Sequence, residues 1–392
     1  MKKLLKLLTK SPSFTKRFKQ MKIAHLNYFP QGIDKGIYNK FITKSEEAIK
    51  NKLEIDFFVL SNFNEEVNSN LKIVKIKYTK EYHLKFFRFS VIERNFNFDA
   101  FEFVILRYPS TKDFSSRRFI KKYGHKIISE HHTNEIAEYK LAGNSILNHF
   151  KVYLEKFNSS YYLSKVNAIV GVTDEIVKLE QSKTNRLKPS FVFSNGTRFN
   201  KSYQKRTEDE FSIIFCCGIF TAWSGLDRLL RSVEKSNLTK KLNIILIGKI
   251  LKEENAKIAS LPKNKNITIQ TLGPLSKEEI IPYYQKVDAS FGTLASFKMD
   301  MKEACPLKTR ESLSYGKPII YAYEDSDFSG NENWNLKLSP TDEIIDLEEI
   351  ILFLEKVRGN ENIEQEIEKY VKERIEWGVK LKKLVSFIAN LK

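Results

Sequence analysis

Short apolar runs alternate with amphipathic stretches along most of the chain. Runs such as FEFVILRY at 101–108 and VNAIVGV at 166–172 are typical of strands buried on both faces. Polar residues or glycine follow each run, and then comes a stretch with helical spacing. This alternation predicts an α/β fold with parallel sheets. In the first half of the chain the predicted strands are 22–28, 55–60, 71–77, 101–108, 126–129, 166–172 and 191–193.

The same alternation begins again after a break. The stretch 201–210 is polar and densely charged, as expected of a linker. Beyond it the predicted strands are 211–218, 242–247, 267–271, 287–291 and 318–321. Two such halves predict two Rossmann-like domains facing a central cleft. We divide the chain into a basic segment at 1–21, a first domain at 22–200, a second domain at 201–362 and a C-terminal helix at 363–392.

Composition fits this picture. At 392 residues the chain is long enough for two domains with cores of their own, and 42% apolar with 29% charged residues is typical of a soluble globular protein. Three cysteines, with Cys216 and Cys217 adjacent, provide neither a disulfide framework nor metal-ligand spacing, which favours a reducing compartment. No apolar run approaches the ~20 residues that span a bilayer. The start, MKKLLKLLTK, is too interrupted by lysine for a signal-peptide core.

Positive charge is concentrated in the first half. Residues 1–200 hold 36 Lys and Arg against 19 Asp and Glu, so they contribute +17 of the total +18. This excess favours an anionic partner: a membrane surface, a lipid-diphosphate acceptor or nucleic acid. The first 22 residues have eight basic and no acidic side chains, which fits a helix on an anionic leaflet or a solvated tail. Aromatic and basic residues interleave at 81–97, which fits base stacking, a membrane interface or an amphipathic core helix.

The stretch MKEACPLKTRESLSYGKPIIYAY at 301–323 has the most informative local pattern. Pro306 suits the first turn of a helix, and Gly316 suits a left-handed cap before an apolar strand. Free amides at the start of this helix would favour a diphosphate. Glu303 precedes the helix and Glu311 lies inside it. The two carboxylates are therefore expected to contact opposite ends of one ligand, such as a nucleoside-diphosphate sugar.

The E-x7-E spacing before a helix, followed by G-x-P and an apolar strand, resembles the donor-site motif of retaining GT-B glycosyltransferases of family four, the "group 1" glycosyltransferases. PLKTRESLSYGKPIIY is similar to the form in polysaccharide-assembly members, and SNGTRF at 194–199 resembles the family's hinge. The resemblance extends over about 22–386. It implies the GT-B fold, a nucleotide-sugar donor, and a terminal helix that crosses back to the first domain with Trp377 as a packing residue.

A second glycine loop departs from the family pattern. Family members have G-R-x-x-x-x-K-G here, and their Arg and Lys bind the diphosphate. This chain has Ile219 and Ser224 at those two places, between Gly218 and Gly225. Either backbone amides hold the diphosphate, or relocated cations do, which we favour; a degenerate, inactive homologue is the remaining alternative. The candidate cations are Arg228, Lys249, Lys308 and Arg310.

His131 and His132 follow a predicted strand, in the sequence EHHTNE. Adjacent histidines beside carboxylates suggest a metal site. However, neighbouring side chains diverge and no cysteine or third histidine lies near in sequence, so the spacing argues against a metal. In family four a histidine after this strand faces the transferred sugar. The resemblance gives that role to one of the two and makes the other a hydrogen-bonded structural residue.

Three further residues complete the expected site. Arg107 ends a strand at the edge where open α/β sheets bind ligands, and the resemblance makes it a candidate for an acceptor phosphate. Gly36 is the best match to the family's loop near the donor phosphates, or it belongs to an ordinary tight turn. By the resemblance, Gly273 lies in a turn that contacts the base through backbone atoms.

The resemblance thus implies a transferase that moves a sugar, with retention, from a nucleoside-diphosphate sugar to a saccharide acceptor, lipid-linked, in surface polysaccharide assembly. Glu311 would bind the ribose and Glu303 the donor sugar. We assign no protein base and expect no cofactor or metal, because no D-x-D motif stands where a metal-dependent enzyme would need one. The basic first domain favours a peripheral position at the inner face of the cytoplasmic membrane. The alternatives are a nucleotide-sugar epimerase and a nucleic-acid-binding protein, although nucleic acid is not the partner that we expect.

Overall fold

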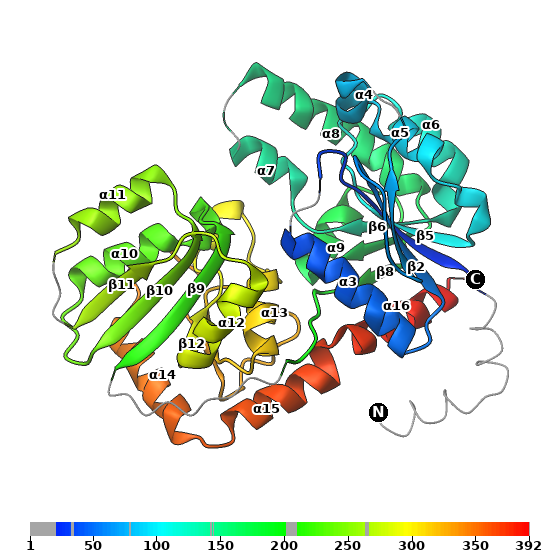
Figure 1. The fold of residues 1–392 in the computed structure, drawn as a ribbon. Coiled ribbons are helices and arrows are strands. Elements are labelled where there is room, and N and C mark those ends of the chain that lie inside the picture. Colours follow the sequence, from blue (N-terminus) through cyan, green and yellow to red (C-terminus); the bar gives the residue numbers. More distant parts are fainter. Residues whose placement is uncertain are drawn as a thin grey trace. The chain divides into compact units, whose positions relative to one another are not determined.

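The computed structural model describes residues 21–32, 35–77, 80–141, 143, 145–200, 210–262 and 266–391. The chain forms two compact units (Figure 1). Unit 1 comprises Met1–Phe193 and Trp377–Lys392, and unit 2 comprises Ser194–Glu376. The boundaries between the units lie at 193/194 and 376/377. The boundaries predicted from the sequence were at 200/201 and 362/363. The basic stretch 1–20 and most of the charged linker lie outside the described residues.

The sheet of unit 1 has its described strands in the order β3-β4-β2-β1-β5-β6-β7-β8. Neighbouring strands are parallel except β3 and β4. Chain order reverses between β1 and β5, so the carboxyl ends there form the edge at which such sheets bind ligands. The strands are β1 (Ile23–Tyr28), β2 (Ile55–Ser61), β3 (Glu65–Asn68), β4 (Leu71–Lys75), β5 (Phe103–Arg107), β6 (Ile127–His131), β7 (Ala168–Gly171) and β8 (Ser190–Val192).

Helices cover both faces of this sheet. One face packs against α3 and α16 around Phe41, Trp377 and Leu381. The other face packs against α5, α6 and α8 around Phe89 and Phe119. The basic-aromatic segment forms two short helices, of which α5 is in the core while α4 buries no residue. The helices are α3 (Lys35–Lys50), α4 (Glu81–Phe86), α5 (Arg88–Asn95), α6 (Ser116–Tyr123), α7 (Glu135–Leu141), α8 (Ile146–Lys165), α9 (Asp174–Ser182) and α16 (Trp377–Ala389).

Unit 2 has a parallel sheet whose described strands lie in the order β11-β10-β9-β12-β13-β14. Helices α10 and α14 build the core on one face, and α12 with α13 covers the other. The strands are β9 (Phe211–Ile219), β10 (Leu242–Lys249), β11 (Ile267–Thr271), β12 (Ala289–Phe291), β13 (Ile319–Tyr321) and β14 (Asn335–Lys337). The helices are α10 (Leu226–Lys235), α11 (Lys252–Ser260), α12 (Lys277–Lys286), α13 (Leu307–Ser314), α14 (Leu347–Gly359) and α15 (Ile363–Tyr370).

The C-terminal segment is not the single helix that the sequence predicted. Helix α15 ends at Tyr370, a π-helical turn occupies Val371–Ile375, and α16 begins at Trp377. The break coincides with the passage from unit 2 to unit 1. Trp377 is 2% exposed, with its ring 5.9 Å from that of Phe193 and the Lys44 ammonium 4.7 Å from its centre. This indole anchors the returning helix in the core of unit 1.

We expect Trp377→Ala to lower the free energy of unfolding of unit 1 by about 3–5 kcal/mol, because a buried indole would leave a cavity. Urea denaturation followed by circular dichroism measures this loss. Trp223→Ala is the matched control, since Trp223 is 39% exposed and should cost less than about 1 kcal/mol. Equal losses in the two variants would contradict the anchoring role.

Candidate functional site

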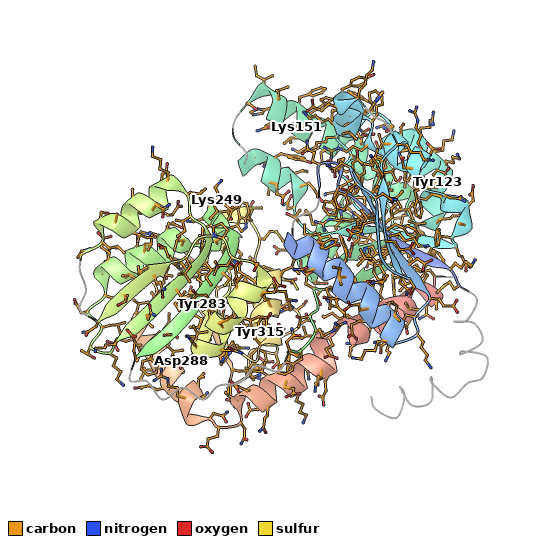
Figure 2. All side chains as sticks on the ribbon, in the orientation of Figure 1. Tyr123, Lys151, Lys249, Tyr283, Asp288 and Tyr315 are labelled. Carbon is orange, nitrogen blue, oxygen red and sulfur yellow. The ribbon has the colours of Figure 1, made fainter. Side chains whose placement is uncertain are left out.

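Glycine turns line the carboxyl edge of the unit 2 sheet. The amide of Gly248 donates to Gly273 at 2.8 Å, and the amide of Phe220 donates to Lys249 at 2.9 Å, so the ends of β9, β10 and β11 are tied together. Gly248 has φ +130°, and a Cβ there would lie 1.7 Å from the carbonyl oxygen of Cys217. Only glycine fits this approach. Figure 2 labels Lys249, which lies exposed at the end of β10.

The loop between β9 and α10 closes without a cation of its own. Gly225 has φ +81°, and a Cβ there would lie 2.7 Å from Cβ of Leu294. Ser224 is 2% exposed and forms a capping box with Thr221. Ile219 is half exposed. Ile219, in the place of the family's Arg, thus supplies an apolar surface. Ser224, in the place of the family's Lys, supplies a turn, and neither residue supplies charge. Gly218 is exposed, and a Cβ at this position would have open space around it to a distance of 4 Å.

Helix α13 brings one lysine to this loop. The Lys308 ammonium lies 3.1 Å from Sγ of Cys217 and 5.0 Å from the ring centre of Phe215, both on β9. The predicted helix, glycine cap and strand of this region are present, and Gly316 has φ +68°. Glu311 lies one turn after Lys308. Burial raises the pKa of Glu311, and Lys277 opposes the rise.

Glu303 is held just ahead of α13 by backbone pairing. It forms an isolated parallel bridge with Glu324, which follows β13. The amide of Ala304 donates to Glu324 at 2.9 Å, and the amide of Glu324 donates to Lys302 at 2.9 Å. The Glu303 side chain is partly exposed. Glu303 and Glu311 therefore flank the start of one helix, as the spacing predicted.

Arg310 is not available as a phosphate ligand, which corrects the sequence prediction. Its side chain is 1% exposed and pairs with Asp325 at 2.7 Å and Asp327 at 2.8 Å. It also donates to the carbonyl of Asn195 at 2.8 Å and contacts Sγ of Cys305 at 3.0 Å. Although burial alone lowers the pKa of Arg310, Asp325 and Cys305 outweigh it and raise that pKa well above its usual value. The guanidinium is a structural cation.

Arg228 is likewise structural, a second correction. It is 2% exposed and donates to the carbonyls of Glu343 at 2.7 Å and Leu294 at 2.8 Å. Its charge lies beneath the glycine loop, where it fixes neighbouring backbone. Of the four candidate cations, Lys308 and Lys249 keep their charge at the edge of the sheet.

In unit 1, Arg107 and His132 lie at the ends of adjacent strands. Arg107 ends β5, and its guanidinium carbon lies 5.2 Å from the ring centre of Phe29. His132 follows β6 directly, with Nε2 3.2 Å from Oε2 of Glu130. Burial, with Arg107 and Lys40 nearby, holds the pKa of His132 well below its usual value. His132 is therefore neutral near pH 7.

Glu130 organises this edge, and sequence reasoning missed its role. It is 1% exposed and lies 2.9 Å from Nε2 of His25, 3.7 Å from Nζ of Lys44 and 3.2 Å from Nε2 of His132. Burial alone would raise its pKa, but His25 and Lys44 outweigh it and hold the pKa well below its usual value. The sequence signal was the glutamate of the E-H pair; its partners on β1 and α3 are remote in sequence.

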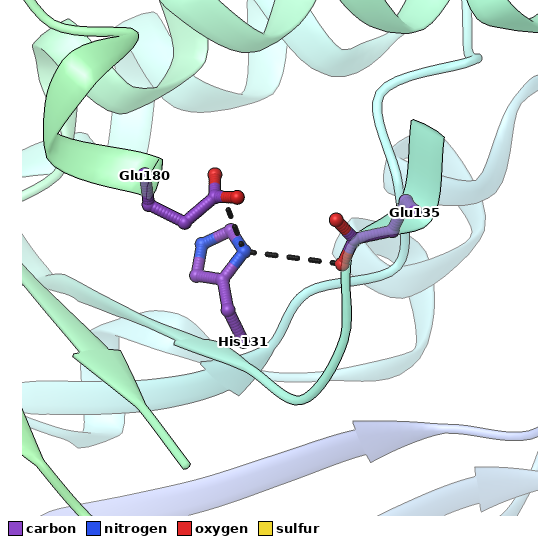
Figure 3. A group of neighbouring side chains, drawn as sticks. All are labelled: His131, Glu135 and Glu180. Carbon is purple, nitrogen blue, oxygen red and sulfur yellow. Dashed lines mark ion pairs between the residues drawn. The ribbon is translucent and has the colours of Figure 1, made fainter. Parts of the chain in front are cut away.

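His131 points away from His132, into the protein. It is fully buried, its Nε2 lies 2.8 Å from Oγ of Ser129, and its ring centre lies 4.4 Å from that of Tyr108. Its Nδ1 faces Glu135 and Glu180 (Figure 3). Burial lowers the pKa of His131 to about 3. This arrangement makes His132 the better candidate to meet a ligand and His131 a buried partner of other side chains.

A basic cavity of about 390 Å³ opens near the ends of β1 and β5. Its lining includes Lys85, Arg88, Lys112 and Lys151, and Lys151 is labelled on α8 in Figure 2. Burial and the neighbouring Arg88 and Lys151 lower the pKa of Lys112 to about 8. Gly36 lies elsewhere, exposed in the first turn of α3. The cavity is suited to an anionic group.

Part of unit 2 matches a known protein family. The sequence model of the family "Glycosyl transferases group 1" matches residues 198–326, which include the glycine loop, Glu303 and Glu311. This part of the chain is a group 1 glycosyltransferase domain. The resemblance seen in the sequence is therefore confirmed. No curated protein sequence matches the transferase.

Solved structures show that the transferase has the GT-B fold. It is similar to sucrose-phosphate synthase from Thermosynechococcus elongatus (12% identity, TM-score 0.63, covering 95% of this chain and 99% of that one). It is also similar to HepE from Anabaena in complex with UDP and glucose (11% identity, TM-score 0.61, covering 94% of this chain and 99% of that one). A third similar structure is that of WaaG, a glycosyltransferase involved in lipopolysaccharide biosynthesis (10% identity, TM-score 0.58, covering 93% of this chain and 99% of that one). The predicted pair of Rossmann-like domains is thus confirmed.

We expect Arg310→Met to destabilise the transferase by about 3–5 kcal/mol, because Asp325 and Asp327 would lose their buried counter-charge. Thermal and urea unfolding measure the loss. Arg231→Met is the control: Arg231 pairs with Asp342 at the same 2.7 Å but in solvent, so its loss should stay below about 1 kcal/mol. An unchanged free energy of unfolding in the Arg310 variant would make the guanidinium a candidate ligand cation again.

Proposed function

We propose that the transferase moves a sugar from a nucleoside-diphosphate sugar to a saccharide acceptor, with retention at the anomeric carbon. The observation that supports this most directly is the position of Lys308. Its ammonium reaches the end of β9 beside a glycine loop that lacks the family's own cations. A leaving diphosphate at the start of α13 would meet free amides and this charge together.

Each carboxylate of the motif has a separate role in the proposal. Glu311 accepts hydrogen bonds from the ribose hydroxyls, and Glu303 binds the hydroxyls of the donor sugar and shields positive charge that develops on it. Stabilising charge where it develops is usually the largest catalytic contribution. The amides of α13 and the ammonium of Lys308 stabilise the diphosphate as it leaves. HepE was solved with UDP and glucose, which supports a donor of this class.

The acceptor side of the proposal rests on unit 1. Neutral His132, fixed by Glu130, orients the donor sugar, and Arg107 binds an acceptor phosphate. The neutral imidazole is suited to hydrogen bonding with the sugar. As the acceptor oxygen bonds to the anomeric carbon and the bond to the diphosphate breaks, the leaving phosphate takes the proton of the acceptor hydroxyl, so the proposal needs no protein base. It also places no metal ion at the diphosphate.

We further propose a lipid-linked acceptor, which the transferase meets as a peripheral protein at the inner face of the cytoplasmic membrane. None of the helices that the structure describes is long and apolar enough to cross a bilayer. Helix α8, however, exposes large apolar side chains along one face beside Lys151 and the basic cavity. Rings that insert at an interface while lysines reach the headgroups fit this pattern. The exposed side chains are Ile146, Leu147, Phe150, Tyr153 and Phe157.

Lys308→Ala is expected to weaken nucleotide-sugar binding by about ten- to one-hundred-fold, since a charge-assisted hydrogen bond contributes roughly 1.5–3 kcal/mol. A thermal-shift panel of UDP-, GDP- and ADP-sugars identifies the donor first. Isothermal titration with that donor then measures the affinity. Lys286→Ala, at an exposed position that ends α12, should bind as the wild type does. Unchanged affinity in the Lys308 variant would mean that the diphosphate lies elsewhere.

The two glutamates should separate binding from turnover. Glu311→Ala is expected to lose donor affinity, because the ribose hydroxyls lose the carboxylate that accepts their hydrogen bonds. Glu303→Ala is expected to keep most of the affinity and lose at least about a hundredfold in kcat, because its contacts strengthen as charge develops. Titration and sugar-transfer assays on both variants test this. Consumption of the nucleoside-diphosphate sugar in the absence of a saccharide acceptor would instead support the epimerase alternative.

A further inference from the structure

His131, Glu135 and Glu180 converge inside unit 1 from three different elements (Figure 3). His131 is the last residue of β6, Glu135 the first of α7, and Glu180 lies near the end of α9. Nδ1 of His131 is 3.5 Å from Oε2 of Glu180 and 3.9 Å from Oε1 of Glu135. One ligand atom from each residue lies within 4.8 Å of the other two, and all three residues are buried.

Nδ1 of the histidine faces these carboxylates without a hydrogen-bond partner among the described residues. Its Nε2 lies 2.8 Å from Oγ of Ser129, a hydroxyl that can donate or accept; in the tautomer in which Nε2–H donates to it, Nδ1 is unprotonated. The opposite tautomer would donate from Nδ1 to Glu180, but 3.5 Å is long for a bond to a carboxylate, which is typically about 2.7–2.9 Å. Among the residues that the structure describes, Nδ1 of His131, Oε2 of Glu135 and Oε2 of Glu180 have no hydrogen-bond partner. The carboxylate atoms turned toward Nδ1 are Oε2 of Glu180 and Oε1 of Glu135.

Negative charge exceeds positive charge around this point. Lys183 pairs with Oε1 of Glu180 at 2.5 Å, and Oε2 of Glu180 has no hydrogen-bond partner among the described residues. Glu135 has no lysine or arginine within ion-pair distance among the described residues; its one ion-pair contact there is with His131 at 3.9 Å. Glu155 adds a further buried carboxylate, which accepts from the Tyr108 hydroxyl at 2.5 Å and the Ser110 hydroxyl at 2.6 Å. A cation between the three ligand atoms would resolve the repulsion.

The distances fit a small metal ion. Ligand atoms about 2.1 Å from a tetrahedral ion are about 3.4 Å apart, close to the separations from Nδ1 of His131 to the two carboxylates. We propose that His131, Glu135 and Glu180 bind one divalent transition-metal ion, with Zn²⁺ as the best match to one imidazole and two carboxylates. Ser129 acts as the outer partner that fixes the imidazole, as is usual for a ligating histidine.

The ion has a structural role in this proposal. It joins α7 and α9 to the end of β6, directly before His132. The ring of Tyr108 lies against the His131 ring and closes the site from one side. The other metal-like group in the described chain, Cys305 with Asp325 and Asp327, already holds the guanidinium of Arg310 and needs no ion.

The test uses the full-length protein without an affinity tag. After incubation with Zn²⁺ and removal of the free ion, mass spectrometry of the metal should find about one zinc per chain. A strong chelator should lower the Tm, and Zn²⁺ should restore it where Mg²⁺ does not. Two results together would overturn the proposal: less than about a tenth of an equivalent of zinc retained per chain, and a Tm that the chelator leaves unchanged. They would show that the three side chains bind protons and no metal ion.

Matched variants locate the ion. Glu180→Gln and Glu135→Gln keep the side-chain shape and should lower zinc retention at least about tenfold. Glu138→Gln is the control, because Glu138 lies on the same helix as Glu135 but is exposed. Co²⁺ substituted for Zn²⁺ should give a spectrum without a thiolate charge-transfer band, since no cysteine belongs to the cluster. Wild-type zinc content in the Glu180 variant, or a thiolate band, would place the ion elsewhere and overturn the assignment.

Discussion

The ion pairs of Arg310 hold the donor half of the molecule together. One buried guanidinium contacts the start of unit 2 at Asn195, the segment before α13 at Cys305, and the loop after β13 at Asp325. Glu303 lies two residues before Cys305, in the segment that these contacts hold, so its position depends on a buried charge. A buried pair of this kind contributes little net stability compared with apolar packing, but it fixes geometry. In this chain the arginine of the PLKTRE motif is buried in ion pairs, and the lysine two residues earlier lies against β9.

Unit 1 uses a carboxylate in the same way. Glu130 gathers His25, Lys44 and His132 from three elements and keeps them at fixed distances. Because the three partners stabilise its charge, the glutamate stays ionised, and burial keeps His132 neutral beside it. Two adjacent histidines thus have different environments. His132 lies at the ligand edge, and His131 lies within a sealed acidic cluster.

Local pattern was sufficient to predict the fold and the helix at the centre of the donor motif. The start of α13, its glycine cap and the following strand depend on neighbours in sequence, so Pro306, Gly316 and the apolar run determine them. The structural roles of Arg228 and Arg310 were not predictable, because their partners Glu343 and Asp325 belong to loops later in the chain. The same holds for Glu130, whose partner His25 is 105 residues away. The break before Trp377 also followed from packing rather than from helical spacing.

The glycines around the donor loop differ in what they permit. Gly248 and Gly225 are closed to any side chain, because backbone or Cβ atoms of Cys217 and Leu294 already occupy that space. Gly218 has open space where a Cβ would lie and no left-handed backbone. A side chain introduced there would project from the end of β9 without disturbing the turn. Gly218 is therefore a position at which a substitution can add a side chain to the surface at the end of β9 while leaving the scaffold intact.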